Sequence, residues 1–205
     1  IFSLLFIQFL GLTNANATNN LAIKLDVTDL AQGMLGDMQA AAKLSKQAHR
    51  FHCTVGFIEK INKEEVATLA ASIQAKLQSK LTTALEFDVK EVSRPFNSDI
   101  IGFIPTTESE NKLIEFNKIV ANVVQEVTNG RYTLNAFTST NYRPHISLAK
   151  VAVTSPDNAL ISFKGSLDAK KNETNRNGRF FLKLGTVSYT LGAFVFGFFN
   201  MIYLL

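Results

Sequence analysis

Two short stretches of this chain place a histidine two positions before a hydroxyl side chain. In the first stretch, His52 precedes Thr54. In the second, His145 precedes Ser147, and apolar residues surround both pairs. Successive side chains of a β-strand point to opposite faces, so on a strand each histidine shares a face with its hydroxyl group. Only the fold can bring the two distant stretches together, and we expect them to form the two halves of one active site.

Residues of these types suit the hydrolysis of a cyclic phosphate ester. The reaction needs a base that takes a proton from water and an acid that protonates the leaving ribose oxygen, on opposite sides of phosphorus. Histidine suits both roles because its unperturbed pKa is about 6.5. The hydroxyl groups of Thr54 and Ser147 could hold the non-bridging oxygens, on which charge builds. His52 and His145 are thus the predicted acid and base, and the sequence leaves open which is which.

Further candidates lie close to the motifs. Tyr142, Arg143 and Lys150 flank the second motif and could contact a phosphate or a base. On a regular strand, Lys150 would face away from the hydroxyl group of that motif. His49 and Cys53 could ligate a metal, but His49 should precede the strand and Cys53 should face away from the motif histidine. We therefore expect no metal site.

Each motif follows a predicted strand and a predicted helix. Alternating apolar residues predict strands, and apolar residues three and four positions apart predict helices. We expect strands at residues 21–27, 51–58, 85–93, 99–104 and 144–149, and helices at residues 29–44, 62–81 and 108–127. Residues 155–167 are weakly patterned, and the polar, Asn-rich segment 170–179 is predicted to be a loop. The order strand, helix, motif strand therefore occurs twice.

Length and composition suit one domain, and the order of the predicted elements places it in the α+β class. Of the 205 residues, 46% are hydrophobic and 17 are Phe, which is enough for a sizeable core. The formal charge of +4 permits an anionic ligand but is too small for a polybasic surface that binds nucleic acid. The single cysteine excludes an internal disulfide and a zinc site made of cysteines.

Both ends of the sequence are apolar. An apolar run opens it, and Ala15 and Ala17 fit the small-x-small rule of signal-peptide cleavage. We expect residues 1–17 to be a secretory signal that exports a domain spanning residues 18–205; a buried N-terminal helix or an uncleaved anchor is the alternative. Residues 192–205 are uncharged and largely apolar, but short for a membrane span. We expect a strand there, with a membrane segment as the alternative.

The two motifs, with Pro144 before the second, resemble the paired His-x-Thr/Ser motifs of the 2H phosphoesterase superfamily. That superfamily includes the 2′,5′ RNA ligase-like proteins and the cyclic phosphodiesterases. The resemblance extends over residues 21–192 in the order of the elements. It implies a bilobal, pseudo-twofold domain in which duplicated β-α-β units form two antiparallel sheets lining a central groove, with the helices outside. It also implies chemistry without a metal or another cofactor.

The function that the resemblance implies is a phosphodiesterase acting on 2′,3′-cyclic phosphates or 2′,5′-phosphodiester links of nucleotides or short RNA. We expect the protein to be a monomer. Two other functions stay open. A protein of the same fold could bind a nucleotide or RNA without turnover, although both motifs are intact here. An exported interaction protein could use the apolar ends for membrane contact.

Overall fold

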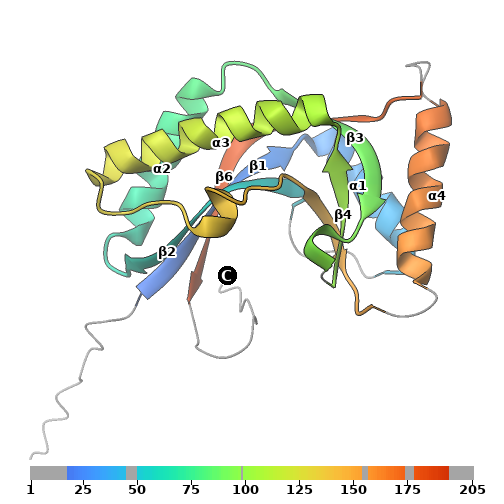
Figure 1. Cartoon of the computed structure of the whole chain (residues 1–205), viewed down its shortest axis with the longest axis horizontal. Coiled ribbons are helices and arrows are strands. Elements are labelled where there is room, and N and C mark those ends of the chain that lie inside the picture. Colours follow the sequence, from blue (N-terminus) through green and yellow to red (C-terminus); the bar gives the residue numbers. More distant parts are fainter. Residues whose placement is uncertain (1–17, 45–49, 98, 154–156, 174–177, 194–205) are drawn as a thin grey trace, which may run out of the picture.

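The structure, a computed structural model, describes residues 18–44, 50–97, 99–153, 157–173 and 178–193 (Figure 1). In these segments, six strands and four α-helices are present. The strands are β1 (Thr18–Val27), β2 (His52–Asn62), β3 (Leu85–Ser93), β4 (Ile100–Pro105), β5 (Ile146–Lys150) and β6 (Phe181–Ala193). The helices are α1 (Asp29–Ala41), α2 (Val66–Lys80), α3 (Thr107–Thr128) and α4 (Asn158–Glu173). Two short 3-10 helices are η1 (Pro95–Asn97) and η2 (Ala136–Thr138).

The six strands form one closed antiparallel sheet in the order β1-β2-β5-β4-β3-β6, and β6 pairs back onto β1. Helices α2 and α3 pack against each other, with α2 contacting β1 and β6 and α3 contacting β2, β3 and β4 (Figure 1). Helix α4 packs on β3 and on α1, which reaches β5. The predicted α+β class is therefore confirmed.

The fold is a duplication. The order β1-α1-β2-α2-β3 is repeated as β4-α3-β5-α4-β6. In each copy the first strand pairs with the second, and the two second strands, β2 and β5, meet. The third strand of each copy pairs with the first strand of the other copy: β3 pairs with β4, and β6 pairs with β1. This exchange joins the two expected sheets into one continuous sheet.

Helix α4 occupies a region for which the sequence predicted no helix. Only Phe163 and Leu167 of this helix are buried, one turn apart. Two buried positions make too short a stripe to stand out as a helical period. The loop prediction for residues 170–179 was wrong at its start, because α4 continues through Glu173.

Strand β6 ends at Ala193, so the strand expected at residues 192–205 is described only at its first two residues. Residues 1–17 and 194–205 lie outside the described residues, as does His49. The signal peptide, the last part of the apolar tail and the position of His49 thus stay expectations. In the described part of the chain, no helix has the length and apolar character needed to cross a membrane.

Candidate active site

The two motif strands meet at one residue pair. Cys53 of β2 pairs with Ile146 of β5, and both side chains are completely buried. Because side chains alternate along a strand, the residues on either side of this pair face away from the core. These are the four motif residues, each of them half-buried: His52, Thr54, His145 and Ser147. The structure therefore brings the two motifs together on one face of the sheet.

The register places each histidine beside the hydroxyl group of the other motif. The two strands are antiparallel and Cys53 pairs with Ile146, so the residue before Cys53 lies opposite the residue after Ile146. His52 is therefore opposite Ser147, and Thr54 is opposite His145. Side chains directly opposite each other have Cβ atoms about 4.5–5.5 Å apart. Positive charge on His145 also lowers the pKa of His52, so the two imidazoles interact electrostatically.

Matched hydrogen bonds orient the two imidazoles. His52 Nδ1 donates to the Arg50 carbonyl oxygen at 2.7 Å, and His145 Nδ1 donates to the Arg143 carbonyl oxygen at 3.0 Å. We assign the proton to Nδ1 in both rings because a carbonyl oxygen can only accept. The other ring nitrogen, Nε2, is then the atom that can exchange a proton with a substrate or water.

Burial lowers the pKa of both imidazoles. The pKa of His52 falls to about 4, first because burial disfavours the charged ring and further because of positive charge on Lys24; the hydrogen bond to the Arg50 carbonyl opposes the shift. Burial also lowers the pKa of His145, again opposed by a carbonyl hydrogen bond. Both rings are therefore mainly neutral at pH 7 in the free protein, as a general base must be.

Strand β1 adds two charged residues that the sequence analysis did not single out. Lys24 is the neighbour of Thr54 across the β1–β2 ladder, and Asp26 is the neighbour of His52. Lys24 is half-buried, and burial lowers its pKa while Asp26 opposes the shift. The sequence did carry a signal for these two residues. The apolar residues that alternate in 21–27 face the core, so the residues between them, Lys24 and Asp26 included, lie on the face of the motifs.

Asp26, which lies beside His52, is held by contacts with Ser188 and Arg50. Asp26 is 7% exposed, and its Oδ1 accepts a hydrogen bond from Ser188 Oγ at 2.8 Å. Arg50 Nε lies 3.7 Å from Asp26 Oδ2, and the same guanidinium donates to Asp29. These contacts tie Arg50 to its own half of the molecule.

Arginine precedes both motif histidines by two positions, so the repeated unit is Arg-x-His-x-Thr/Ser. Arg143 was among the predicted site residues and Arg50 was not, although Arg50 holds the same position relative to its own motif. The two arginines differ in their contacts. Arg50 is paired with Asp26 and Asp29. Among the described residues, Arg143 forms no ion pair, and its guanidinium lies 5.8 Å above the Phe96 ring.

In the second half, a glycine makes room for the motif. Gly102 of β4 is the neighbour of Ser147, the position that Lys24 holds in the first half. A Cβ atom at Gly102 would lie 3.0 Å from the Ile146 carbonyl oxygen and 3.8 Å from His145 Cδ2. The first distance is shorter than ordinary packing allows, so the close approach of β4 to His145 requires glycine at this position.

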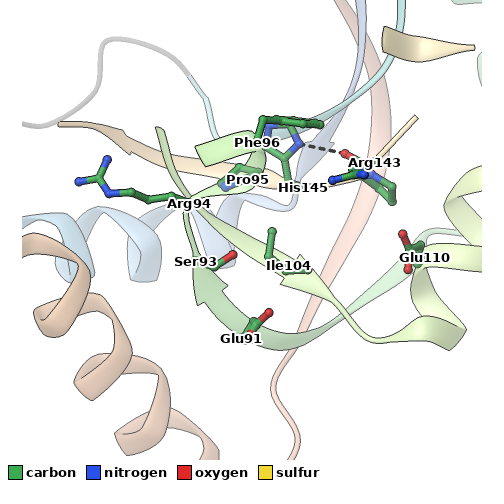
Figure 2. A pocket seen from close by; sticks show the side chains of 10 residues that line it. Glu91, Ser93, Arg94, Pro95, Phe96, Ile104, Glu110, Arg143 and His145 are labelled. Carbon is green, nitrogen blue, oxygen red and sulfur yellow. Dashed lines mark hydrogen bonds between the residues drawn. The ribbon is translucent and has the colours of Figure 1, made fainter. Parts of the chain in front are cut away.

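A cavity of about 300 Å³ opens beside His145. Figure 2 shows His145 and Phe96 close together, with Arg143 next to them and the floor formed by β3 and β4. The Phe96 ring meets the His145 imidazole edge to face, with ring centroids 5.7 Å apart at an angle of 79°. The residues that line the cavity include Glu91, Phe96, Ile104, Glu110, Arg143 and His145.

Tyr142 lies apart from the four motif side chains. Its hydroxyl group is 3.6 Å from Cys53 Sγ, on the core side of β2. Burial raises the pKa of Tyr142 well above its ordinary value, with smaller contributions from Cys53. Tyr142 therefore packs beneath the site and does not face it.

A β-bulge changes the direction of Lys150. Ile101 pairs with Ala149 and Gly102 pairs with Ser147, which leaves Leu148 as an extra residue in β5. Leu148 and Ala149 are both buried, so the next residue, Lys150, returns to the face of Ser147. Sequence reasoning for a regular strand had placed Lys150 on the opposite face. Its Nζ lies 3.4 Å from Asp99 Oδ2.

No cluster of three metal-binding side chains occurs among the residues that the structure describes. Cys53 is buried, and burial raises the pKa of its thiol to about 11. This thiol is therefore protonated at neutral pH and unsuited to metal binding.

Comparisons with known proteins identify similar structures. No protein-family model and no curated protein matches this chain. The crystal structure of E. coli LigT with 3′-AMP is 12% identical over 92% of this chain and 94% of that chain, with a TM-score of 0.48. The complex with NADP+ is 13% identical over the same shares, with a TM-score of 0.47. At these identities the likeness is one of overall fold alone.

Proposed function

We propose that this protein is a metal-independent phosphodiesterase that hydrolyses 2′,3′-cyclic phosphates or 2′,5′-phosphodiester links of nucleotides or short RNA. The observation that carries the proposal is the meeting of two His-x-hydroxyl units on one face at the β2–β5 contact. Both imidazoles are oriented by matched Nδ1 hydrogen bonds, which assign proton exchange to Nε2. Two imidazoles and two hydroxyl groups around one phosphate supply the base, the acid and the donors that the reaction needs.

The proposed reaction is an in-line displacement at phosphorus. His52 Nε2 takes a proton from water as the water oxygen bonds to phosphorus. The bond from phosphorus to a ribose oxygen breaks, and His145 Nε2 gives its proton to that oxygen. The low pKa of His52 keeps this ring neutral, as a base requires. The negative phosphate favours the protonated form of His145 when the substrate is bound.

Three further side chains of the site would hold the phosphate. The hydroxyl groups of Thr54 and Ser147 donate to its non-bridging oxygens, where charge builds in the transition state. The Lys24 ammonium group lies on the Thr54 side and adds positive charge to the same region. These groups replace the charge neutralisation that a metal ion supplies in other phosphodiesterases.

The proposal is tested by hydrolysis of 2′,3′-cyclic nucleotides in the presence of EDTA. We expect turnover by the wild-type protein and a loss of kcat/KM of roughly 10²-fold or more in His52→Ala and in His145→Ala, since one acid or base contributes about 10²–10⁴-fold. His49→Ala is the matched control, because His49 is the one histidine outside the motifs. Rates that are equal in the wild type and both motif variants would refute the proposal.

A further inference from the structure

The cavity beside His145 contains groups that phosphate chemistry does not need. Glu91 enters it from β3 and Glu110 from the first turn of α3 (Figure 2). Neither carboxylate forms an ion pair with any described residue. Carboxylates repel a phosphate but accept hydrogen bonds, so these two suit a part of a ligand that carries hydrogen-bond donors.

Phe96 is held in an unusual conformation at the edge of this cavity. Its φ of 62° and ψ of 21° lie in the left-handed region, which residues with a Cβ rarely adopt. Its side chain is 49% exposed although it is a large apolar group. Strained backbone of this kind persists where the surroundings enforce it and is common at ligand sites. The conformation presents an aromatic ring beside His145, with the Arg143 guanidinium above it.

An aromatic ring and an arginine plane are the two surfaces on which proteins stack unpaired nucleobases. Carboxylates accept hydrogen bonds from the amino groups of bases, such as N4 of cytosine. Guanine has two adjacent donors on its Watson–Crick edge, N1–H and the N2 amino group, and one carboxylate can accept both. Uracil has no amino group, and its single donor, N3–H, lies between two carbonyl oxygens that the same carboxylates would repel.

At the matching position of the other half, a buried carboxylate takes the place of an apolar residue that lines the cavity. Where Ile104 lines the cavity, the duplicated position holds Asp26, which is buried and bound to Ser188 and Arg50. Glu91 and Ile104 are neighbours across the β3–β4 ladder, and Thr186 and Asp26 are neighbours at the matching place in β6 and β1. The two halves thus differ at the positions that would surround a base.

We propose that the cavity beside His145 binds the base of a nucleotide substrate, with Phe96 and Arg143 as stacking surfaces and Glu91 and Glu110 as acceptors that select amino-bearing bases. Guanine is the preferred base and uracil the least favoured. This inference rests on the proposed function, because it takes the phosphate to lie between the two histidines. With the nucleoside on this side, the leaving ribose oxygen is next to His145.

The first test compares the four 2′,3′-cyclic mononucleotides as substrates. We expect kcat/KM for the guanosine compound to exceed that for the uridine compound by about tenfold or more, the discrimination of a good bidentate contact to a base. Glu91→Gln/Glu110→Gln should remove most of this preference, chiefly by lowering kcat/KM for the guanosine compound. Glu64→Gln is the matched control, because Glu64 is an exposed carboxylate outside the cavity. Phe96→Leu should lower kcat/KM for all four cyclic mononucleotides.

The second test measures binding without turnover. In His52→Ala, which leaves every residue of the cavity in place, calorimetry should show tighter binding of 2′-GMP than of 2′-UMP, and a loss of the difference in the double glutamine variant. Equal affinity for both nucleotides, or a preference that the double variant keeps, would overturn this inference even if the protein hydrolyses all four substrates. Retained 2′-GMP preference in a protein that hydrolyses none of them would instead overturn the proposed activity alone.

Discussion

At the scale of single residues, Lys24 distinguishes the two histidines. Its positive charge helps to lower the pKa of His52, whereas Asp26 raises that pKa. A base must be neutral, so kcat/KM should fall on the acidic side as the pH drops through the pKa of His52, about 4. In Lys24→Met the repulsive charge is gone and the pKa of His52 rises, so this acidic limb should move to higher pH.

Rate profiles against pH measure the effect of Lys24 directly. Lys24→Arg keeps the charge and should keep the wild-type acidic limb. An acidic limb of Lys24→Met that stays in place, or moves to lower pH, would contradict the placement of Lys24 beside His52. The same variant should also lower kcat, because a charge near the phosphate is lost.

Gly102 allows β4 to lie close to the second motif. In Gly102→Ala the new methyl group meets the Ile146 carbonyl oxygen at 3.0 Å, and this backbone atom lies next to His145. We expect kcat to fall by up to about 10-fold, since the carbonyl oxygen must give way by only part of an ångström and a misplacement of about 1 Å costs about 100-fold. Gly33→Ala in α1 is the matched control, because a Cβ there has no neighbour within 4 Å. Equal activity of the two variants in a turnover assay would refute the argument.

At the scale of elements, Asp157 fixes the start of α4. Its Oδ1 accepts a hydrogen bond from the Leu160 backbone N–H at 3.2 Å, which caps the helix. Its Oδ2 lies 2.5 Å from Arg94 Nη2 and accepts from Arg94 Nε at 2.7 Å, in a largely buried pair. Asp157→Ala would leave the Arg94 charge buried beside two backbone carbonyls. We expect the free energy of unfolding to fall by about 3–5 kcal/mol.

Chemical denaturation of Asp157→Ala measures that loss. Glu115→Ala is the control, since the one described partner of Glu115 is Lys118, in an exposed pair that is worth about 0.2–0.5 kcal/mol. If Asp157→Ala were as stable as Glu115→Ala, the capping and ion-pair account of α4 would be wrong.

The sequence predicted elements where one local pattern dominates and failed where tertiary contacts decide. The alternation around His52 and His145 predicted strands, and these strands meet as expected. The bulge at Leu148 has no local signal, because it is defined by pairing with β4, and it reversed the expected face of Lys150. Helix α4 was missed because it buries only Phe163 and Leu167 and depends on contacts with distant residues.

At the scale of the whole molecule, the duplication was visible in the sequence but the exchange of strands was not. The order strand, helix, motif strand follows from the residue pattern within each segment of the sequence. The crossing of β3 to β4 and of β6 to β1 is a choice of partners between halves, which no repeat in the sequence specifies. Because of this exchange each half completes the sheet of the other, and we expect the domain to unfold in a single transition.

Export is also a property of the whole chain. We propose that residues 1–17 are a secretory signal removed after Ala17, since an apolar run is followed by small residues in the cleavage pattern. The first strand, β1, begins at Thr18, so removal would leave the sheet intact. Mass spectrometry of the protein recovered after secretion should find Thr18 as the first residue, and Ala17→Arg should block processing. A recovered protein that retains residues 1–17 would contradict this proposal.

The central claim is that His52 and His145 act on one phosphate as a pair. A double-mutant cycle in kcat/KM for 2′,3′-cyclic GMP, measured with EDTA present, tests it most directly. Residues that act as a unit give strongly non-additive effects. We predict that His52→Ala and His145→Ala each lose roughly 10²-fold or more, and that the double variant loses little beyond the more severe single variant. Full activity in either single variant, or losses that multiply in the double variant, would contradict the claim.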